Sequence, residues 1–379
     1  MSERFIPYGR QTIDEDDIAA VVEVLKSDWL TTGPKIKEFE DAVCRYISCK
    51  QGIAVNSGTS ALDVAVASLE LPKGSEIITT PFTFVATSNA ILYNNLLPVF
   101  ADIKPDTFNI NPDEIRKKIT DKTRAIIYVD FAGQPCDIDA IRGIADEHDL
   151  YLIEDACHAL GAEYKGKKVG SFANITVFSF HPVKPITTGE GGMAVTNNKC
   201  LANRMRMLRN HGIDLDPAKR KDYRYDMKTL GRNYRMTDFQ AALGISQLRK
   251  LDRFIIRRTE LVKGYNNAFE SLSGITCPVF KPDRMSSNHL YTVLLNPSIS
   301  RDEFFTKMRG LNIGVNVHYI PVYHHSYYRN AFDVSPADYP VTEDVFNRIL
   351  TLPLHQGMTK EDVDYVIDSV KSILKKGHR

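Results

Sequence analysis

Long hydrophobic runs and a surplus of charge of either sign are both missing from this sequence. No apolar run of about 18 residues occurs, and the first residues, MSERFIPYGRQ, lack an apolar core of signal-peptide length. With 48 basic and 47 acidic side chains, the net charge is +1. Nothing global therefore attracts nucleic acid or a membrane surface, and we expect neither as a partner.

Cysteines at disulfide or metal-binding spacing are also missing. The six cysteines are scattered, and none lies in a CxxC pair or near a cluster of histidines. Scattered cysteines are typical of free thiols in a reducing compartment. We therefore expect a cytoplasmic protein without disulfides and without a metal site.

Basic side chains do gather locally, at 204–209, at 219–221 and at Arg257 with Arg258. Their spacing suits exposed helix faces. A contact with a polyphosphate group is the alternative.

Seven short apolar runs, many rich in β-branched residues, recur in the first half of the chain. Such runs are typical of buried strands. They cover residues 52–55, 76–80, 98–103, 125–131, 151–155, 174–180 and 193–197. Helical patterns lie between several of them, at 59–70, 84–95, 111–119 and 137–149, with Asn111 and Asp137 as expected N-terminal caps. This alternation predicts an α/β fold with a mostly parallel seven-stranded sheet covered by helices on both faces.

The pattern changes after about residue 237. A helical stretch at 237–272 contains no strand, and HLYTVLLN and NIGVNVHYIP follow as strand-like runs, with two further helices that include 360–376. A chain of 379 residues has room for two domains. We therefore expect a large domain over residues 1–245, including an N-terminal arm, and a smaller α+β domain over residues 246–379.

Ligands of doubly wound sheets bind where the strands end at their carboxyl edge. NSGTSAL, residues 56–62, follows the first predicted strand and precedes a helix. Glycine allows close backbone approach, and free N–H groups at a helix start bind phosphate. The alternative is a simple capped helix with Ser57 or Thr59 as its cap.

Three more unusual residues follow strand ends. Asp155 ends YLIED, Lys184 follows NITVFSF within HPVKP, and Phe84 lies in PFTFVAT. Taken singly, each has an ordinary explanation: a helix cap, a surface lysine in a turn and a core aromatic. Together with NSGTSAL they predict a ligand with a phosphate, an aromatic ring with a basic nitrogen, and a carbonyl that condenses with an amine.

Pyridoxal phosphate has these three groups. Asp155 would hold the pyridine nitrogen protonated, because an opposite charge a few Å away stabilises the cation. Lys184 would form the Schiff base and, once displaced by an incoming amine, act as a base. Phe84 would stack on the ring.

Four motifs in order, NSGTSAL, EDACHALGA, FSFHPVKPITTGEGG and GRNYRMTDFQAALGISQL, resemble those of DegT-type sugar-nucleotide aminotransferases of the fold-type I pyridoxal phosphate superfamily. The resemblance covers nearly the whole chain. It implies that Gly58, Thr59 and Ser179 contact the phosphate and that His158 lies beside the cofactor. It also implies that Asn233 reaches the phosphate from the neighbouring subunit of a homodimer. For Asn233 a plain turn or cap residue is the alternative.

The resemblance implies a substrate side as well. His318 and Tyr319 match a loop near the sugar, and Tyr8 and Arg10 are candidates for the nucleotide side. For His158 and His318 a purely structural role is the alternative.

The segments IPYGRQTIDEDDI, LTTGP, HPVKP and NVHYIPVY are most similar to family members of pseudaminic acid biosynthesis. The expected reaction moves the amino group of L-glutamate to carbon 4 of UDP-2-acetamido-2,6-dideoxy-β-L-arabino-hex-4-ulose, a UDP-linked keto sugar. The same chemistry on another sugar, a D-series 4-keto or a dTDP-linked 3-keto sugar, is the alternative. A dehydratase would carry histidine at Lys184, and a regulator without turnover would tolerate loss of Lys184 or Asp155.

Overall fold

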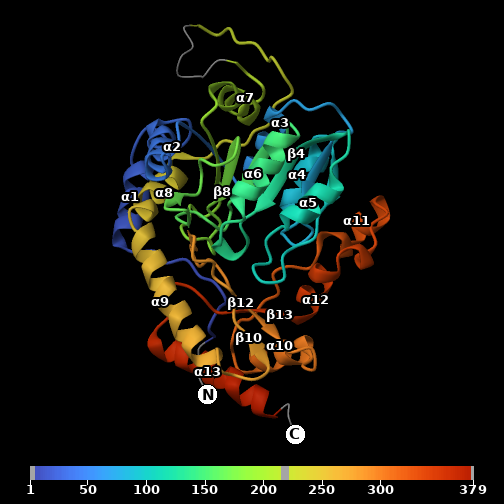
Figure 1. The fold of residues 1–379 in the computed structure, drawn as a ribbon. Coiled ribbons are helices and arrows are strands. Elements are labelled where there is room, and N and C mark those ends of the chain that lie inside the picture. Colours follow the sequence, from blue (N-terminus) through green and yellow to red (C-terminus); the bar gives the residue numbers. More distant parts are fainter. Residues whose placement is uncertain (1–4, 215–221, 377–379) are drawn as a thin grey trace.

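The computed structural model describes residues 5–214 and 222–376. Its main sheet has seven strands in the order β1–β9–β8–β5–β4–β2–β3 (Figure 1). In chain order these are β1 (Gln51–Val55), β2 (Glu76–Thr79), β3 (Leu97–Phe100), β4 (Thr123–Val129), β5 (Tyr151–Asp155), β8 (Ile175–Ser179) and β9 (Gly192–Thr196). Strands β8, β5, β4, β2 and β3 are parallel, and β9 is antiparallel to both β8 and β1. Every predicted strand of this sheet is thereby confirmed, and so is its mostly parallel character.

Helices cover both faces of this sheet, as expected. One face packs against α3 (Gly58–Ser68), α4 (Ala86–Tyr93) and α7 (Lys199–Arg209). The other packs against α2 (Pro34–Ile47), α5 (Pro112–Lys118), α6 (Ile138–Glu147) and α8 (Asp238–Leu248). Side chains alternate along each strand, so Leu152 faces one layer and Ile153 the other. Burial on both faces explains why these strands consist of nearly continuous apolar residues.

The helical stretch at 237–272 consists of two helices, α8 and α9 (Leu251–Phe269), which are separated by Arg249 and Lys250. Figure 1 shows α9 running from the large sheet to the C-terminal part. The predicted domain division at residue 245 falls within α8 and stays a prediction. Helix α1 (Glu15–Leu25) lies against α8.

The C-terminal part is built on a small antiparallel sheet in the order β10–β12–β13. Its strands are β10 (Ile275–Thr276), β12 (Tyr291–Leu295) and β13 (Ile349–Leu352), and it shares a core with α9, α10 (Arg301–Gly310) and α13 (Lys360–Lys376). Two more helices, α11 (Ser326–Ala331) and α12 (Pro340–Arg348), lie between α10 and β13. The described residues after 275 thus form four α-helices where two were expected.

The predicted strand at 312–321 is wrong. This segment makes only single bridges, from Ile313 to Ile6 and from Asn316 to Thr351. The third strand of the small C-terminal sheet is instead β13, which follows α12 directly. A short apolar run that continues a helical pattern cannot be distinguished from the end of that helix by periodicity alone.

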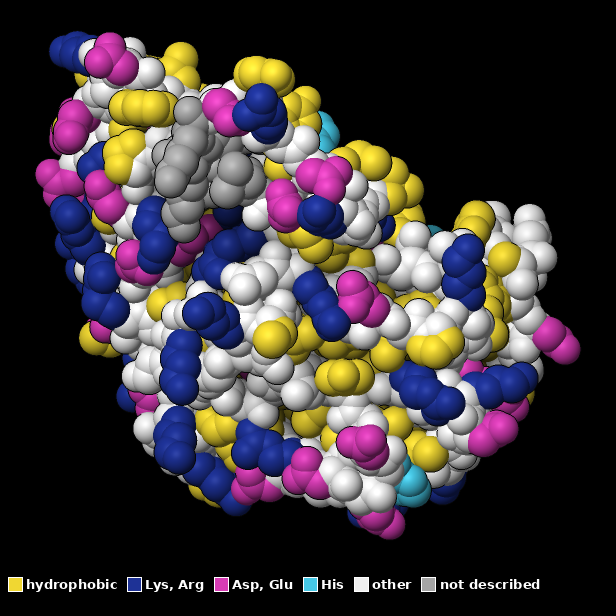
Figure 2. Space-filling model, turned by 90° about the horizontal axis from the view of Figure 1, so that it is seen from above, with side chains coloured by type: hydrophobic (Ala, Val, Ile, Leu, Met, Phe, Trp, Pro, Cys, Tyr) yellow, Lys and Arg dark blue, Asp and Glu magenta, His cyan; other side chains and the backbone are white. Residues whose placement is uncertain are grey.

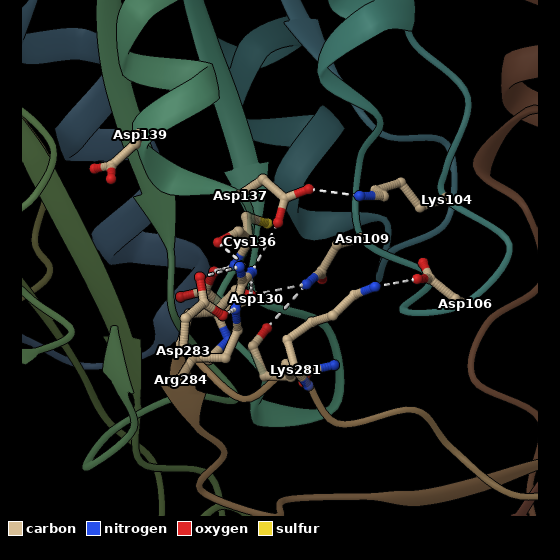
Figure 3. Close-up of polar contacts among 12 residues, drawn as sticks. Lys104, Asp106, Asn109, Asp130, Cys136, Asp137, Asp139, Lys281, Asp283 and Arg284 are labelled. Carbon is tan, nitrogen blue, oxygen red and sulfur yellow. Dashed lines mark hydrogen bonds and ion pairs between the residues drawn. The ribbon is translucent and has the colours of Figure 1, made fainter. Parts of the chain in front are cut away.

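Asp137 does not cap α6 through its side chain, which corrects another expectation, whereas Asn111 does cap α5. The Asp137 carboxylate instead lies 2.7 Å from Lys104 Nζ and 3.0 Å from Arg284 of β11 (Arg284–Met285). Figure 3 shows these contacts beside the ion pair of Lys281 with Asp106. Ion pairs therefore link the loops of the large sheet to residues 281–284. Strand β11 also pairs with β6 (Glu163–Tyr164), and β6 pairs with β7 (Lys167–Lys168).

The surface carries both charges interspersed, as the face in Figure 2 shows. Arg204 and Arg209 pair with Glu70 and Glu40. Arg258 is fully buried and donates to three backbone carbonyls, so its expected place on an exposed helix face is wrong. The basic residues 219–221 lie outside the described residues. Across the described chain, no helix is both long and apolar enough to cross a membrane.

Candidate active site

The carboxyl edge of the large sheet brings the main candidates together. Strand β5 ends at Asp155, and β8 ends at Ser179, five residues before Lys184. The turn after β1 leads into α3, whose first residue is Gly58. Strands β5 and β8 are neighbours, and Gly192 of β9 is paired with both Ser179 and Val55. Residues far apart in the sequence thus meet at one edge.

The start of α3 forms a cradle suited to a phosphate group. The Ser57 side chain caps the helix by accepting from the Ser60 N–H, so the alternative of a capped helix is correct, and this cap leaves other N–H groups of the first turn available to a ligand. The N–H groups of Gly58 and Thr59 are among the first of the helix, which have no partner within it. A methyl group on Gly58 would lie 2.9 Å from Ser179 Cβ and 3.1 Å from its Oγ. The Ser179 hydroxyl therefore lies directly beside this helix start.

Close packing around the cradle continues at Gly192. A Cβ on Gly192 would lie 2.3 Å from the Ser57 carbonyl oxygen and 2.7 Å from the Gly58 nitrogen. Only a residue without a side chain lets β9 approach the turn this closely. Glycine at position 192 is therefore required for this close approach.

Asp155 is buried and held at both carboxylate oxygens. Its Oδ2 accepts a 2.8 Å hydrogen bond from the Thr87 hydroxyl, and its Oδ1 accepts a longer one, 3.3 Å, from the Cys157 N–H. A buried carboxylate is costly unless it is paired or hydrogen-bonded. These two donors supply part of that compensation and fix the direction of the carboxylate.

Lys184 is half-buried and follows a short turn. Its backbone N–H donates to the His181 carbonyl at 2.9 Å, and Pro182 and Pro185 flank the segment. Burial lowers the pKa of Lys184 from its ordinary value, and the nearby Cys157 and Asp155 partly oppose that shift. A lowered pKa favours the free amine, which is the nucleophilic form.

Two histidines and a tyrosine form the wall next to Lys184. The ring of His158 stacks on Tyr319 at 6.0 Å between centroids, and its Nε2 shares a 2.9 Å hydrogen bond with the Tyr319 hydroxyl. Burial, with the charge of Lys184 adding to it, holds the pKa of His158 well below its ordinary value. Burial lowers the pKa of His318 to about 3. Both imidazoles are therefore neutral near pH 7.

The N-terminal arm reaches this wall through Tyr8. The Tyr8 ring lies 5.3 Å from that of His318, and the Tyr8 carbonyl accepts from the Leu354 N–H. His318 Nδ1 in turn shares a 2.9 Å hydrogen bond with the Thr351 hydroxyl. Arg10 is exposed and is not brought to this wall by any described contact.

Phe84 is 58% exposed, which excludes a place in the core, and its ring lies 6.2 Å from Tyr319. The Asn233 side chain is exposed in the single chain. Next to it, the Tyr234 carbonyl accepts from the Asn56 N–H, so this segment runs past the end of β1. Among the described residues, no three His, Cys, Asp or Glu side chains are grouped to hold a metal.

Three residues of the site were not anticipated from sequence. Thr87 bonds Asp155, and Cys157 lies close enough to Asp155 and Lys184 for the charge of each to act on the pKa of its thiol. The buried ring of His289 lies 4.5 Å from that of His158. No sequence signal identifies them, because all three contacts depend on how distant segments pack.

Known proteins resemble this chain over nearly its whole length. The DegT/DnrJ/EryC1/StrS aminotransferase family matches residues 11–371. The UDP-4-amino-4,6-dideoxy-N-acetyl-beta-L-altrosamine transaminase of Campylobacter jejuni is 41% identical and covers 98% of both chains. Helicobacter pylori PseC, an aminotransferase involved in the biosynthesis of pseudoaminic acid, superposes with a TM-score of 0.94 at 36% identity, over 98% of this chain and 100% of its own. The PLP-form of Spr1654, a proposed sugar aminotransferase of Streptococcus pneumoniae, gives a TM-score of 0.93 at 32% identity, over 99% of this chain and 100% of its own.

The chain therefore belongs to the DegT/DnrJ/EryC1/StrS aminotransferase family. It is a sugar aminotransferase that depends on pyridoxal phosphate, and its fold is that of its relatives. The residues present fit this cofactor: a helix start beside Ser179 suits the phosphate, Asp155 suits the ring nitrogen, and Lys184 suits the carbonyl carbon. The predicted cofactor and enzyme class are confirmed.

Proposed function

We propose that this aminotransferase moves the amino group of L-glutamate to carbon 4 of UDP-2-acetamido-2,6-dideoxy-β-L-arabino-hex-4-ulose, a step towards pseudaminic acid. The names of the Campylobacter jejuni and Helicobacter pylori relatives support this substrate. The observation that carries the amino transfer is the meeting of Lys184 and Asp155 at one sheet edge beside the cradle of Gly58 and Ser179.

Pyridoxal phosphate supplies a carbon that bonds to amines and a ring that accepts electrons from the bond being broken. Lys184 would hold the cofactor at its carbonyl carbon, and the Lys184 amine would move a proton on and off the reacting carbon. Asp155 keeps the ring nitrogen protonated through its negative charge. At an effective dielectric near 20, this attraction is on the order of 4 kcal/mol.

The other proposed cofactor contacts are to its phosphate and its ring. Gly58, Thr59 and Ser179 bind the phosphate, Phe84 covers one side of the ring, and His158 lies beside it. Asn233 completes the phosphate site of a neighbouring copy, so the active unit is a homodimer. The exposure of the Asn233 side chain next to the end of β1 is consistent with this assignment.

The sugar side of the site is formed by the His318–Tyr319 segment and by the N-terminal arm. Tyr8 packs against His318, and this contact supports a role of the arm in binding the sugar nucleotide. A neutral His318 donates or accepts hydrogen bonds without attracting the diphosphate. Arg10 is exposed and meets the nucleotide from outside.

Product identification tests the proposal. The purified protein is incubated with pyridoxal phosphate, L-glutamate and a panel of UDP- and dTDP-linked keto sugars, and the products are analysed by mass spectrometry and NMR. We expect amination at carbon 4 of the L-arabino UDP sugar. Preference for a dTDP-linked 3-keto or a D-series 4-keto sugar would overturn the substrate and leave the chemistry intact. If no amino donor changes the absorbance of the bound cofactor, the proposed amino transfer fails.

A further inference from the structure

Two threonine hydroxyls form a buried chain that ends on Asp155. The Thr83 and Thr87 hydroxyls are 3.0 Å apart, and Thr87 Oγ1 donates to Asp155 Oδ2 at 2.8 Å. All three residues are buried. An ionised carboxylate only accepts hydrogen bonds, so the Thr87 proton must point to Asp155. The Thr87 oxygen is then an acceptor for the Thr83 hydroxyl, and the chain runs in one direction.

The backbone explains why the two hydroxyls meet. Thr87 lies in the first turn of α4, and Thr83 lies in the bend just before this helix, so its hydroxyl contacts that of Thr87. Phe84 lies three residues before Thr87 but is largely exposed. The segment PFTFVAT thus presents a ring to the open site and two hydroxyls to the interior.

We propose that Thr87 is a positioning residue that fixes the Asp155 carboxylate for the cofactor's ring nitrogen, with Thr83 polarising the Thr87 hydroxyl. The inference rests on the proposed role of Asp155. With Oδ2 engaged by Thr87, the carboxylate is prevented from rotating, and Oδ1 makes only the longer contact with the Cys157 N–H. Thr87 and Phe84 lie in one short segment. The Asp155 carboxylate held by Thr87 and the ring of Phe84, both assigned to the cofactor's ring, therefore keep a fixed position relative to each other.

Substitution of Thr87 by valine removes the hydroxyl and keeps the shape. We expect Thr87→Val to weaken pyridoxal phosphate binding about tenfold, because a hydrogen bond to a charged group is lost. Thr87→Ser restores the donor and is expected to bind the cofactor close to the level of the unchanged protein. Thr83→Val removes only the polarising bond, and its effect is expected to be smaller.

Thr79→Val is the matched control. Thr79 is also a buried threonine, but its hydroxyl donates to the Ile127 carbonyl at 2.9 Å and not to Asp155. Cofactor affinity is measured by equilibrium dialysis against pyridoxal phosphate for the full chain, without any sugar. We expect Thr79→Val to leave this affinity unchanged, even if it lowers the thermal stability.

A double-mutant cycle with Asp155→Ala isolates the route of the effect. In the Asp155→Ala background, Thr87→Val is expected to cause no further loss of affinity. The inference is overturned if Thr87→Val lowers the cofactor affinity equally in both backgrounds. It is also overturned if Thr87→Val binds the cofactor as tightly as the unchanged protein, or if Thr87→Ser binds it as weakly as Thr87→Val. If Asp155→Ala alone leaves the affinity unchanged, the proposed role of Asp155 fails, and the inference is overturned with it.

Discussion

Asp155 and Lys184 belong to the same candidate site but are held in opposite ways. The Asp155 carboxylate is buried at a strand end and accepts hydrogen bonds from Thr87 and from the Cys157 N–H. Lys184 is half-buried, and its backbone N–H is bonded within its own turn, to the His181 carbonyl. One group is fixed at its charged atoms, and the other is fixed only at its base.

This difference fits the two proposed tasks. A carboxylate that keeps a ring nitrogen protonated must keep one orientation, because its effect depends on distance and direction. An amine that moves a proton between two atoms must swing while its origin stays in place. The two prolines around Lys184 stiffen its backbone and leave its side chain free to move.

The largest effect is expected when the moving group is removed. Lys184→Ala should still bind pyridoxal phosphate but lose about 10³-fold or more of its transaminase activity, because the proton-transfer base is gone. The control is Lys73→Ala, which removes an exposed lysine that also lies beside proline, between Pro72 and Gly74. Appreciable turnover by Lys184→Ala, measured as 2-oxoglutarate released, would remove Lys184 from its assigned role.

Removing the fixed group should cost less. Asp155→Ala is expected to reduce kcat on the order of 10²- to 10³-fold, matching the loss of an attraction of a few kcal/mol. Folding should be less affected, which thermal denaturation monitors. Asp146→Ala, at an exposed position in α6, serves as the control. Near-normal rates in Asp155→Ala would show that another group holds the ring nitrogen.

A third change targets the helix start beside Ser179. Gly58→Ala places a methyl group 2.9 Å from Ser179 Cβ, and we expect about tenfold weaker cofactor binding because a hydrogen bond to the charged phosphate is disturbed. Gly143→Ala in α6 is the matched control, since a Cβ there meets nothing within 4 Å. Equal affinities of the two variants by fluorescence titration would argue against a phosphate at this helix start.

The smallest effect concerns the rings facing Lys184. Burial lowers the pKa of His158, His289 and His318 in the folded chain. Below about pH 6.5 the unfolded chain therefore binds more protons than the folded one, and the free energy of unfolding falls as pH falls. Each neutral histidine contributes a loss of about 1.4 kcal/mol per pH unit in this range.

Urea denaturation of the cofactor-free protein at pH 7.5 and pH 5.5 measures this slope. His318→Gln should flatten it, and His148→Gln, at an exposed position, should not. A slope that is unchanged in His318→Gln would show that His318 is protonated in the folded protein. That result would place a second cation near Lys184 and change its electrostatic surroundings.

The sequence predicts the large sheet well because its strands are buried on both faces and have no competing pattern. It predicts the 312–321 segment wrongly because this segment has a strand-like pattern without the strand pairing. Val315 and Val317 alternate with polar residues as in a strand, yet only Asn316 pairs with β13. The residues ILTL of β13 continue the pattern of α12, so their strand conformation depends on pairing with β12.

Among the candidate site residues, those next to strand ends could be located from sequence. Asp155, Ser179 and Gly58 lie at the expected edge because parallel strands share their direction. Thr87 could not be assigned, because its contact depends on how α4 crosses the sheet edge two strands away from β5. The same holds for His289, which reaches His158 from the C-terminal part.

The N-terminal arm has a consequence for synthesis on the ribosome. Ile6 exchanges backbone hydrogen bonds with Asn312 and Gly314, and the Tyr8 carbonyl accepts from Leu354. At 5–20 residues per second, the ribosome needs on the order of 15 to 70 s to make the roughly 300 to 350 residues that separate these partners. During that time the arm must wait undocked, so the large sheet can form before the wall of the proposed sugar site closes.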